Sequence, residues 1–120
     1  TLIFLAHNGP TGLGSKKESI WGCDFRAEAG DYGDPDLEAT IAYARKQGKY
    51  VTAVIAGHMH HQLMDGGLRQ WLIESDETTY INAARVPRIF QFNGQTIHHH
   101  LSMTLNQDQI TVEEVLSSNR

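Results

Sequence analysis

The sequence predicts an α/β protein built around a mixed β-sheet. Two apolar stretches of strand length, residues 2–6 and 50–56, flank one amphipathic helical stretch. This strand–helix–strand order favours a parallel crossover connection. Beyond residue 68 the apolar residues fall in shorter, alternating stretches, which are typical of antiparallel hairpins. We therefore expect parallel strands followed by antiparallel hairpins near the C-terminus, with helices on one side.

The first strand is expected over residues 2–6, where five apolar residues follow one another without a charge. An uninterrupted apolar run of this length predicts a buried strand. A turn-rich segment with several glycines follows over residues 7–14, and residues 15–33 have no sustained period, as in a loop. Because the chain opens directly in this strand, with neither an initiator Met nor a charged leader, we expect it to be part of a longer protein.

The helix is predicted to begin after Asp34, a good N-cap, with Pro35 at the first helical position. Gly48 should end it. One face is apolar and carries Leu37, Ile41 and Ala44.

The second strand, residues 50–56, reads as buried and stops at Gly57. Shorter strands are expected over residues 71–73, 79–82, 88–92, 97–105 and 109–116. The last two are joined by residues 106–108, Asn-Gln-Asp, a plausible hairpin turn.

Composition excludes several classes of protein. A 120-residue chain with 40% hydrophobic and 20% charged residues is typical of one soluble globular domain. The net charge of −4 and the lack of a Lys/Arg cluster argue against nucleic acid as a partner. No apolar run reaches the roughly 18 residues of a membrane span. Cys23 is the single cysteine, so no intrachain disulfide can form, and we expect a cytoplasmic protein.

Histidines carry the strongest chemical signal. His58 and His60 directly follow the second strand, and Gly57 permits a sharp turn before them. In extended backbone the two imidazoles would project to one side, with Cα atoms roughly 6–7 Å apart. They could share one metal ion or reach two ions roughly 3.5–4 Å apart. His7 follows the first strand in the same way, so we interpret His7, His58 and His60 as metal ligands rather than surface histidines.

Three segments together resemble the second half of a calcineurin-like metallophosphoesterase. They are Ala-His-Asn-Gly-Pro at residues 6–10, Gly-His-Met-His at 57–60, and the strand and turn at 80–88, which contain Asn82 and end in Pro-Arg. The resemblance spans residues 2–116. It implies that residues 1–120 form the C-terminal part of a single domain, a β-sandwich flanked by helices, whose N-terminal half is absent from this sequence.

The resemblance also implies a function. His7 and His58 would bind one divalent metal ion and His60 a second, the ions being Mn, Fe or Zn. Asn82 would shape the turn beneath the site without binding metal. The complete protein would then be an enzyme that hydrolyses a phosphate ester.

This sequence departs from the family pattern in the motifs that would supply the remaining metal ligands. The family motifs Asp-x-His, Gly-Asp-x-x-Asp and Gly-Asn-His-Asp/Glu normally precede the His7-type motif, and here they do not. Neutral imidazoles leave the charge of two divalent ions uncompensated, whereas such sites normally include carboxylates. We therefore expect the N-terminal half of the domain to supply them, and the 120 residues alone to be inactive. The alternative is a degenerate or truncated domain that binds metal without catalysis.

Two further patterns are interpreted as structural. Residues 30–34 match Gly-Asp-x-x-Asp, but they follow His7, so Asp34 is interpreted as a helix cap and Asp31 as a turn residue. In the run of histidines at 98–100, strand alternation places His99 at the edge of the core and its two neighbours either in solvent or at the contact between sheets.

His61 points away from His60 and is not expected to bind metal. Gln62 breaks both the metallo-β-lactamase pattern, His-x-His-x-Asp-His, and the alternating histidines of the histidine-triad hydrolases.

Overall fold

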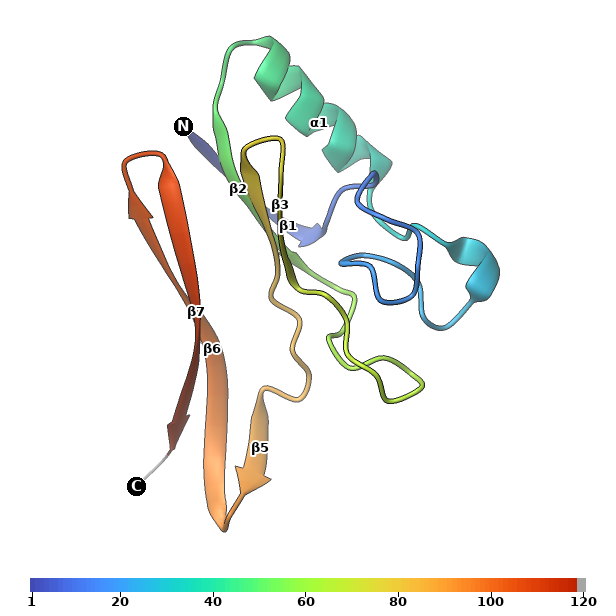
Figure 1. Cartoon of the computed structure of the whole chain (residues 1–120), viewed down its shortest axis with the longest axis vertical. Coiled ribbons are helices and arrows are strands. Elements are labelled where there is room, and N and C mark those ends of the chain that lie inside the picture. The colour runs from blue at the N-terminus through green and yellow to red at the C-terminus, as the bar shows by residue number, and fades with distance from the viewer. Residues whose placement is uncertain (119–120) are drawn as a thin grey trace.

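The structure is a computed structural model that describes residues 1–118. It contains two β-sheets, one α-helix and one short 3-10 helix, η1 (Ala27–Ala29), within those residues. The first sheet has four strands in the order β1-β2-β4-β3, and the second has three in the order β5-β6-β7 (Figure 1). A mixed α/β fold is thereby confirmed, although strands outnumber helices more than predicted.

The first sheet is mixed, as the sequence predicted. β1 (Leu2–Asn8), β2 (Val51–Gly57) and β4 (Thr78–Asn82) run parallel, while β3 (Leu72–Ser75) pairs antiparallel with β4. Asn8 pairs with Gly57, so β1 and β2 end side by side at one edge of the sheet.

The helix α1 (Pro35–Lys46) is also as predicted. The Asp34 side chain accepts hydrogen bonds from the backbone N–H groups of Asp36 at 2.8 Å and Leu37 at 3.4 Å. Ile41 and Ala44 are buried against β2. The capping residue and the apolar stripe together fix where the helix begins and which face it buries.

β1 departs from its prediction. It was expected to be buried, but it is an edge strand with an alternating pattern, and Leu5 is 78% exposed. β2 is the central strand that the same kind of apolar run predicted correctly. Apolar composition alone does not say which strand of a sheet has a neighbour on both sides.

The β3–β4 hairpin extends the mixed sheet, but the last three strands form a sheet of their own. They are β5 (Ile89–Phe92), β6 (Gln95–Asn106) and β7 (Gln109–Ser118). The two-residue turn between β6 and β7 lies inside the predicted segment 106–108. α1 contacts β2 on one side of the first sheet and β7 contacts it on the other (Figure 1).

The run of histidines lies on β6 with the predicted alternation. His99 is buried, at 4% exposure, and its Nε2 lies 3.1 Å from Glu114 Oε2 on β7. His98 is half-buried and His100 is exposed. This run therefore belongs to the second sheet.

Candidate metal centre

His7 and His58 meet at the edge of the sheet where β1 and β2 end. Nε2 of His7 lies 3.1 Å from Nδ1 of His58, and the ring centroids are 4.8 Å apart. Both side chains are exposed to solvent. The expected convergence of these two histidines at the ends of adjacent parallel strands is confirmed.

The backbone around His58 is not extended, contrary to the sequence interpretation. His58 has φ +72°, and the N–H of Met59 donates to the carbonyl oxygen of Gly57 at 2.9 Å. A hydrogen bond across three residues with positive φ at the centre is the rarer kind of γ-turn. Such a conformation costs about 1–3 kcal/mol for a residue with a Cβ, and it persists only when the surroundings enforce it. The turn aims His58 back towards His7.

Side chains from distant parts of the chain enforce this turn. Trp21 Nε1 donates to the carbonyl oxygen of Gly57 at 3.0 Å, and Asn82 Nδ2 donates to that of Met59 at 2.7 Å. Trp21 and Asn82 are almost completely buried. The carbonyl groups on both sides of His58 are thus fixed by rigid, buried donors.

Asn82 has the structural role that the resemblance implied. Its Nδ2 also donates to the carbonyl oxygen of Ile20 at 2.9 Å, and its Oδ1 accepts from the N–H of Ala84 at 3.0 Å. The amide therefore uses both its donors and its acceptor inside the protein. It connects the end of β4 with the histidine turn and with the loop before α1.

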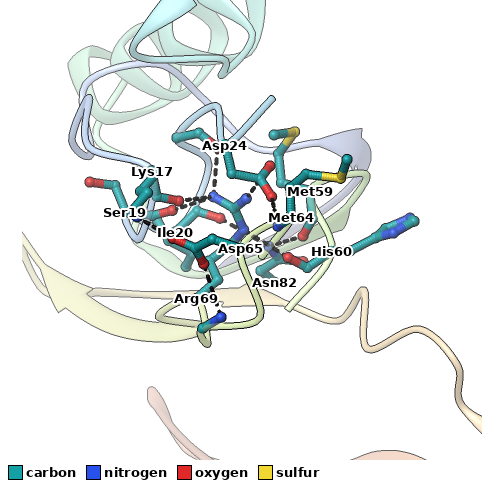
Figure 2. Close-up of polar contacts among 12 residues, drawn as sticks. Lys17, Ser19, Ile20, Asp24, Met59, His60, Met64, Asp65, Arg69 and Asn82 are labelled. Carbon is teal, nitrogen blue, oxygen red and sulfur yellow. Dashed lines mark hydrogen bonds and ion pairs between the residues drawn. The ribbon is translucent and has the colours of Figure 1, made fainter. Parts of the chain in front are cut away.

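The loop that follows β2, residues 58–64, is called the histidine loop below. A buried arginine, Arg69, holds the rest of this loop, and nothing in the sequence singled that arginine out. The side chain of Arg69 is 0% exposed and that of Asp24, its ion-pair partner at 3.0 Å, is 8% exposed. Arg69 Nε donates to the carbonyl oxygen of His60 at 2.9 Å. Its Nη1 donates to three further carbonyl groups, those of Lys17, Ser19 and Gly22 (Figure 2).

His60 lies at the exposed side of this loop. Its side chain is exposed and projects away from the Arg69 guanidinium (Figure 2). Its imidazole lies close enough to His58 for the two charges to influence each other. His60 thus flanks the His7–His58 pair without taking part in the hydrogen bond between them.

The surroundings of His58 favour its neutral imidazole form. Partial burial, followed by the neighbouring His7 and His60 imidazoles, lowers the pKa of His58 below its ordinary value. Neutral imidazole is the form of histidine that binds metal ions. At neutral pH His58 is therefore ready to offer a ring nitrogen to an ion.

His61 is a structural residue, in line with its expected absence from the metal site. It is 9% exposed, and its ring stacks on Trp71 with centroids 5.9 Å apart. Its Nε2 lies 2.5 Å from the carbonyl oxygen of Asn82. Burial lowers the pKa of His61, so the folded protein keeps it neutral and it donates to that carbonyl.

The two aspartates of the misplaced Gly-Asp-x-x-Asp match have backbone partners, as predicted. Asp34 caps α1. Asp31 accepts from the N–H of Gly12 at 2.8 Å through one carboxylate oxygen and from the N–H of Gly33 at 2.9 Å through the other. Both carboxylates therefore stabilise the loop that precedes α1.

Tyr32, in that loop, is a further site residue that the sequence did not indicate. Its ring lies nearly parallel to that of His58, with centroids 6.0 Å apart and an interplanar angle of 13°. Asn8 Nδ2 donates to the carbonyl oxygen of Tyr32 at 2.7 Å. The residue after His7 therefore positions the ring that stacks on His58.

Gly9 allows the loop to approach this closely. A Cβ atom on Gly9 would lie 2.0 Å from the Trp21 ring, so only glycine fits above the buried indole. Close packing against Trp21 therefore explains why the third residue of the His-Asn-Gly-Pro segment is glycine.

The separation of the two ring nitrogens fits the hydrogen bond between them and equally fits two ligands of one metal ion. Zn–N distances of about 2.0–2.1 Å place two imidazole nitrogens on one ion about 2.9–3.4 Å apart, for bond angles between 90° and tetrahedral. The observed 3.1 Å falls within this range. Within residues 1–118, no group of three or more His, Cys, Asp or Glu side chains is arranged to hold one ion.

Comparisons add no relative to this description. No protein-family model, curated protein sequence or solved structure matches the chain. Over the described part of the chain, no helix is long and apolar enough to cross a membrane.

Proposed function

We propose that this chain forms part of a metal-dependent phosphoesterase in which His7 and His58 bind one divalent ion and His60 contributes to a second. The observation that carries the proposal is the 3.1 Å separation of His7 Nε2 and His58 Nδ1 at the ends of two parallel strands. The choice of phosphate esters as substrates rests on the order of the three motifs along the sequence.

The strained turn at His58 supports a functional role for this histidine. Glycine tolerates positive φ better than histidine does, so backbone stability alone gives no reason for histidine here. Residues held in costly backbone conformations cluster at functional sites. The buried Trp21 and Asn82 donors hold the turn, and together they preorganise His58 for binding.

Metal ions bound at such a site would lower the pKa of a water molecule and neutralise charge on the phosphoryl oxygens. Hydrolysis forms a bond from the water oxygen to phosphorus and breaks the ester P–O bond, and the leaving alkoxide takes up a proton. The three histidines offer neutral ligands only. The carboxylate ligands and the proton donor are accordingly proposed to come from the N-terminal half of the same domain.

A second candidate is a non-catalytic domain that binds a single ion through His7 and His58. The same 3.1 Å contact favours it, because two imidazoles suffice to hold one ion weakly. The two candidates share the ion at His7 and His58, and they differ in turnover and in the second ion at His60.

The test compares the full-length protein with its His58→Asn variant and with the 120-residue chain, using an aryl phosphate and added Mn²⁺. Asparagine tolerates the positive φ at this position, so the substitution removes the imidazole and keeps the turn. Of these three proteins, we expect only the unmodified full-length protein to turn over the ester. His100→Asn, at an exposed position on β6, is the matched control and should retain full activity.

Each other result refutes a separate part of the proposal. Metal-dependent turnover by the 120-residue chain would refute the need for outside ligands. Full activity in His58→Asn would refute the ligand assignment. Metal binding by the full-length protein without turnover of any phosphate ester would favour the non-catalytic domain.

A further inference from the structure

An exposed aromatic surface adjoins the histidine pair. Phe25 is 50% exposed, and its ring contacts that of Tyr32 edge-on with centroids 5.3 Å apart. Tyr32 in turn stacks on His58. The rings of Phe25 and Tyr32 stand at 74° to each other, and Tyr32 connects Phe25 with the proposed metal site; the two rings are called the aromatic ledge below.

The ledge belongs to a loop that is held firmly at several points. The N–H of Cys23 donates to the carbonyl oxygen of Gly30 at 2.8 Å, and the N–H of Tyr32 donates to that of Trp21 at 2.9 Å. Asp31 and Asn8 add the side-chain hydrogen bonds described above. The half-exposed Phe25 ring on this fixed loop therefore offers a preformed apolar surface to a ligand.

Space and charge next to the ledge suit the organic part of an ester better than its phosphate. A shallow depression that is open to solvent borders Tyr32. Asp31 and Asp34 also line it, and their carboxylates would repel a phosphoryl group. Arg26 lies over the Phe25 ring, 5.8 Å from its centroid, and places one positive charge beside the ledge.

We propose that the aromatic ledge of Phe25 and Tyr32 binds a planar ring in the alcohol part of the substrate, which makes the substrate an aryl or nucleoside phosphate. The inference rests on the proposed function for the position of the phosphoryl group at His7 and His58. Rings stack on aromatic side chains with favourable free energy in water, and all nucleobases and aryl groups offer such a face. A sugar phosphate or a phosphoserine peptide gains nothing from the ledge.

The experiment uses the full-length protein with Mn²⁺ and two esters of the same alcohol type, adenosine 5′-phosphate and ribose 5-phosphate. Both are primary alkyl phosphates on a ribose, so their comparison isolates the ring. Stacking predicts a kcat/KM about tenfold higher for the adenosine ester. Binding of phenyl phosphate and cyclohexyl phosphate, measured by calorimetry, tests a simple aryl group in the same way.

Phe25→Leu is the informative variant, because it removes a ring that does not contact the histidines and leaves an apolar side chain. It should reduce the preference for each ring-bearing ester severalfold and leave kcat/KM for ribose 5-phosphate unchanged. Phe92→Leu, which replaces an exposed phenylalanine on β5, is the control and should change neither value.

The outcomes separate this inference from the proposed function. Equal kcat/KM and equal binding for ring-bearing and ring-free esters would overturn the inference and leave the phosphoesterase proposal standing. If no ester is hydrolysed, ring-selective binding that Phe25→Leu weakens would uphold the ledge and refute the enzyme. A preference for the adenosine ester alone identifies a nucleoside phosphate, and a preference for phenyl phosphate alone identifies an aryl phosphate.

Discussion

Arg69 donates a hydrogen bond from Nε to the main-chain carbonyl oxygen of His60 at 2.9 Å, and its guanidinium is completely buried beside Asp24. This relationship ties the exposed histidine loop to a charge in the interior. Asp24 in turn accepts from the N–H of Met64 at 2.7 Å. Both ends of the loop are therefore anchored to the same buried ion pair.

Replacing Arg69 by Met should destabilise the protein by about 3–5 kcal/mol. The substitution leaves the Asp24 carboxylate buried without its partner and removes the donors of several carbonyl groups. Urea denaturation measures the loss. Arg88→Met, at an exposed position, should change the free energy of unfolding by no more than about 0.5 kcal/mol. Equal stabilities for the two variants would contradict the role assigned to Arg69.

Asn82→Asp tests the support beneath the histidine turn. The substitution keeps the size of the side chain but replaces the Nδ2 donor with an oxygen, which then faces the carbonyl oxygens of Ile20 and Met59. Two buried acceptors lose their donor, and we expect a loss of about 2–4 kcal/mol in thermal or urea denaturation. Stability within about 0.5 kcal/mol of the unmodified protein would disprove this assignment.

Short-range sequence patterns predicted the helix and the strands well. The wrong prediction, a buried β1, concerns pairing between strands that are far apart in the sequence. The cap at Asp34, the helix, and the alternation around His99 follow from short-range rules, and the structure confirms them. β2 is central because β4, far along the chain, pairs with it on the side away from β1, whereas β1 pairs with β2 alone among the described residues.

The candidate site was predictable only where residues follow strands. His7 and His58 could be placed together because parallel strands share their carboxyl ends. The γ-turn at His58 was not foreseeable, since it depends on donors from Trp21 and Asn82. Arg69 had no sequence signal at all, because a single arginine in a polar stretch reads as a surface residue.

Asp34→Ala should cost about 1 kcal/mol, because it removes the side-chain acceptor of two N–H groups at the start of α1. Asp36→Ala is the matched control inside the same first turn. It removes a similar charge near the helix N-terminus without removing the cap, and a few tenths of a kcal/mol are expected. Chemical denaturation of both variants decides the question, and a larger effect at Asp36 would be inconsistent with the cap.

Glycine and alanine at position 58 should reverse their usual order of stability. Glycine generally destabilises a folded chain relative to alanine because it has more freedom when unfolded. At φ +72° alanine carries the cost of the left-handed conformation and glycine does not. We expect His58→Gly to be about 1 kcal/mol more stable than His58→Ala in thermal unfolding. The opposite order would show that the backbone at position 58 is not strained for a residue with a Cβ.

Locating the metal ion itself tests most directly whether His7 and His58 are its ligands. Crystals of the full-length protein grown with Zn²⁺ or Mn²⁺ should give an anomalous difference peak within about 2.3 Å of both His7 Nε2 and His58 Nδ1, at the ends of β1 and β2. Asp31 and Asp34 should carry no such peak. A saturated metal site that involves neither His7 nor His58, or two imidazoles still hydrogen-bonded to each other at saturating metal, would contradict the central claim.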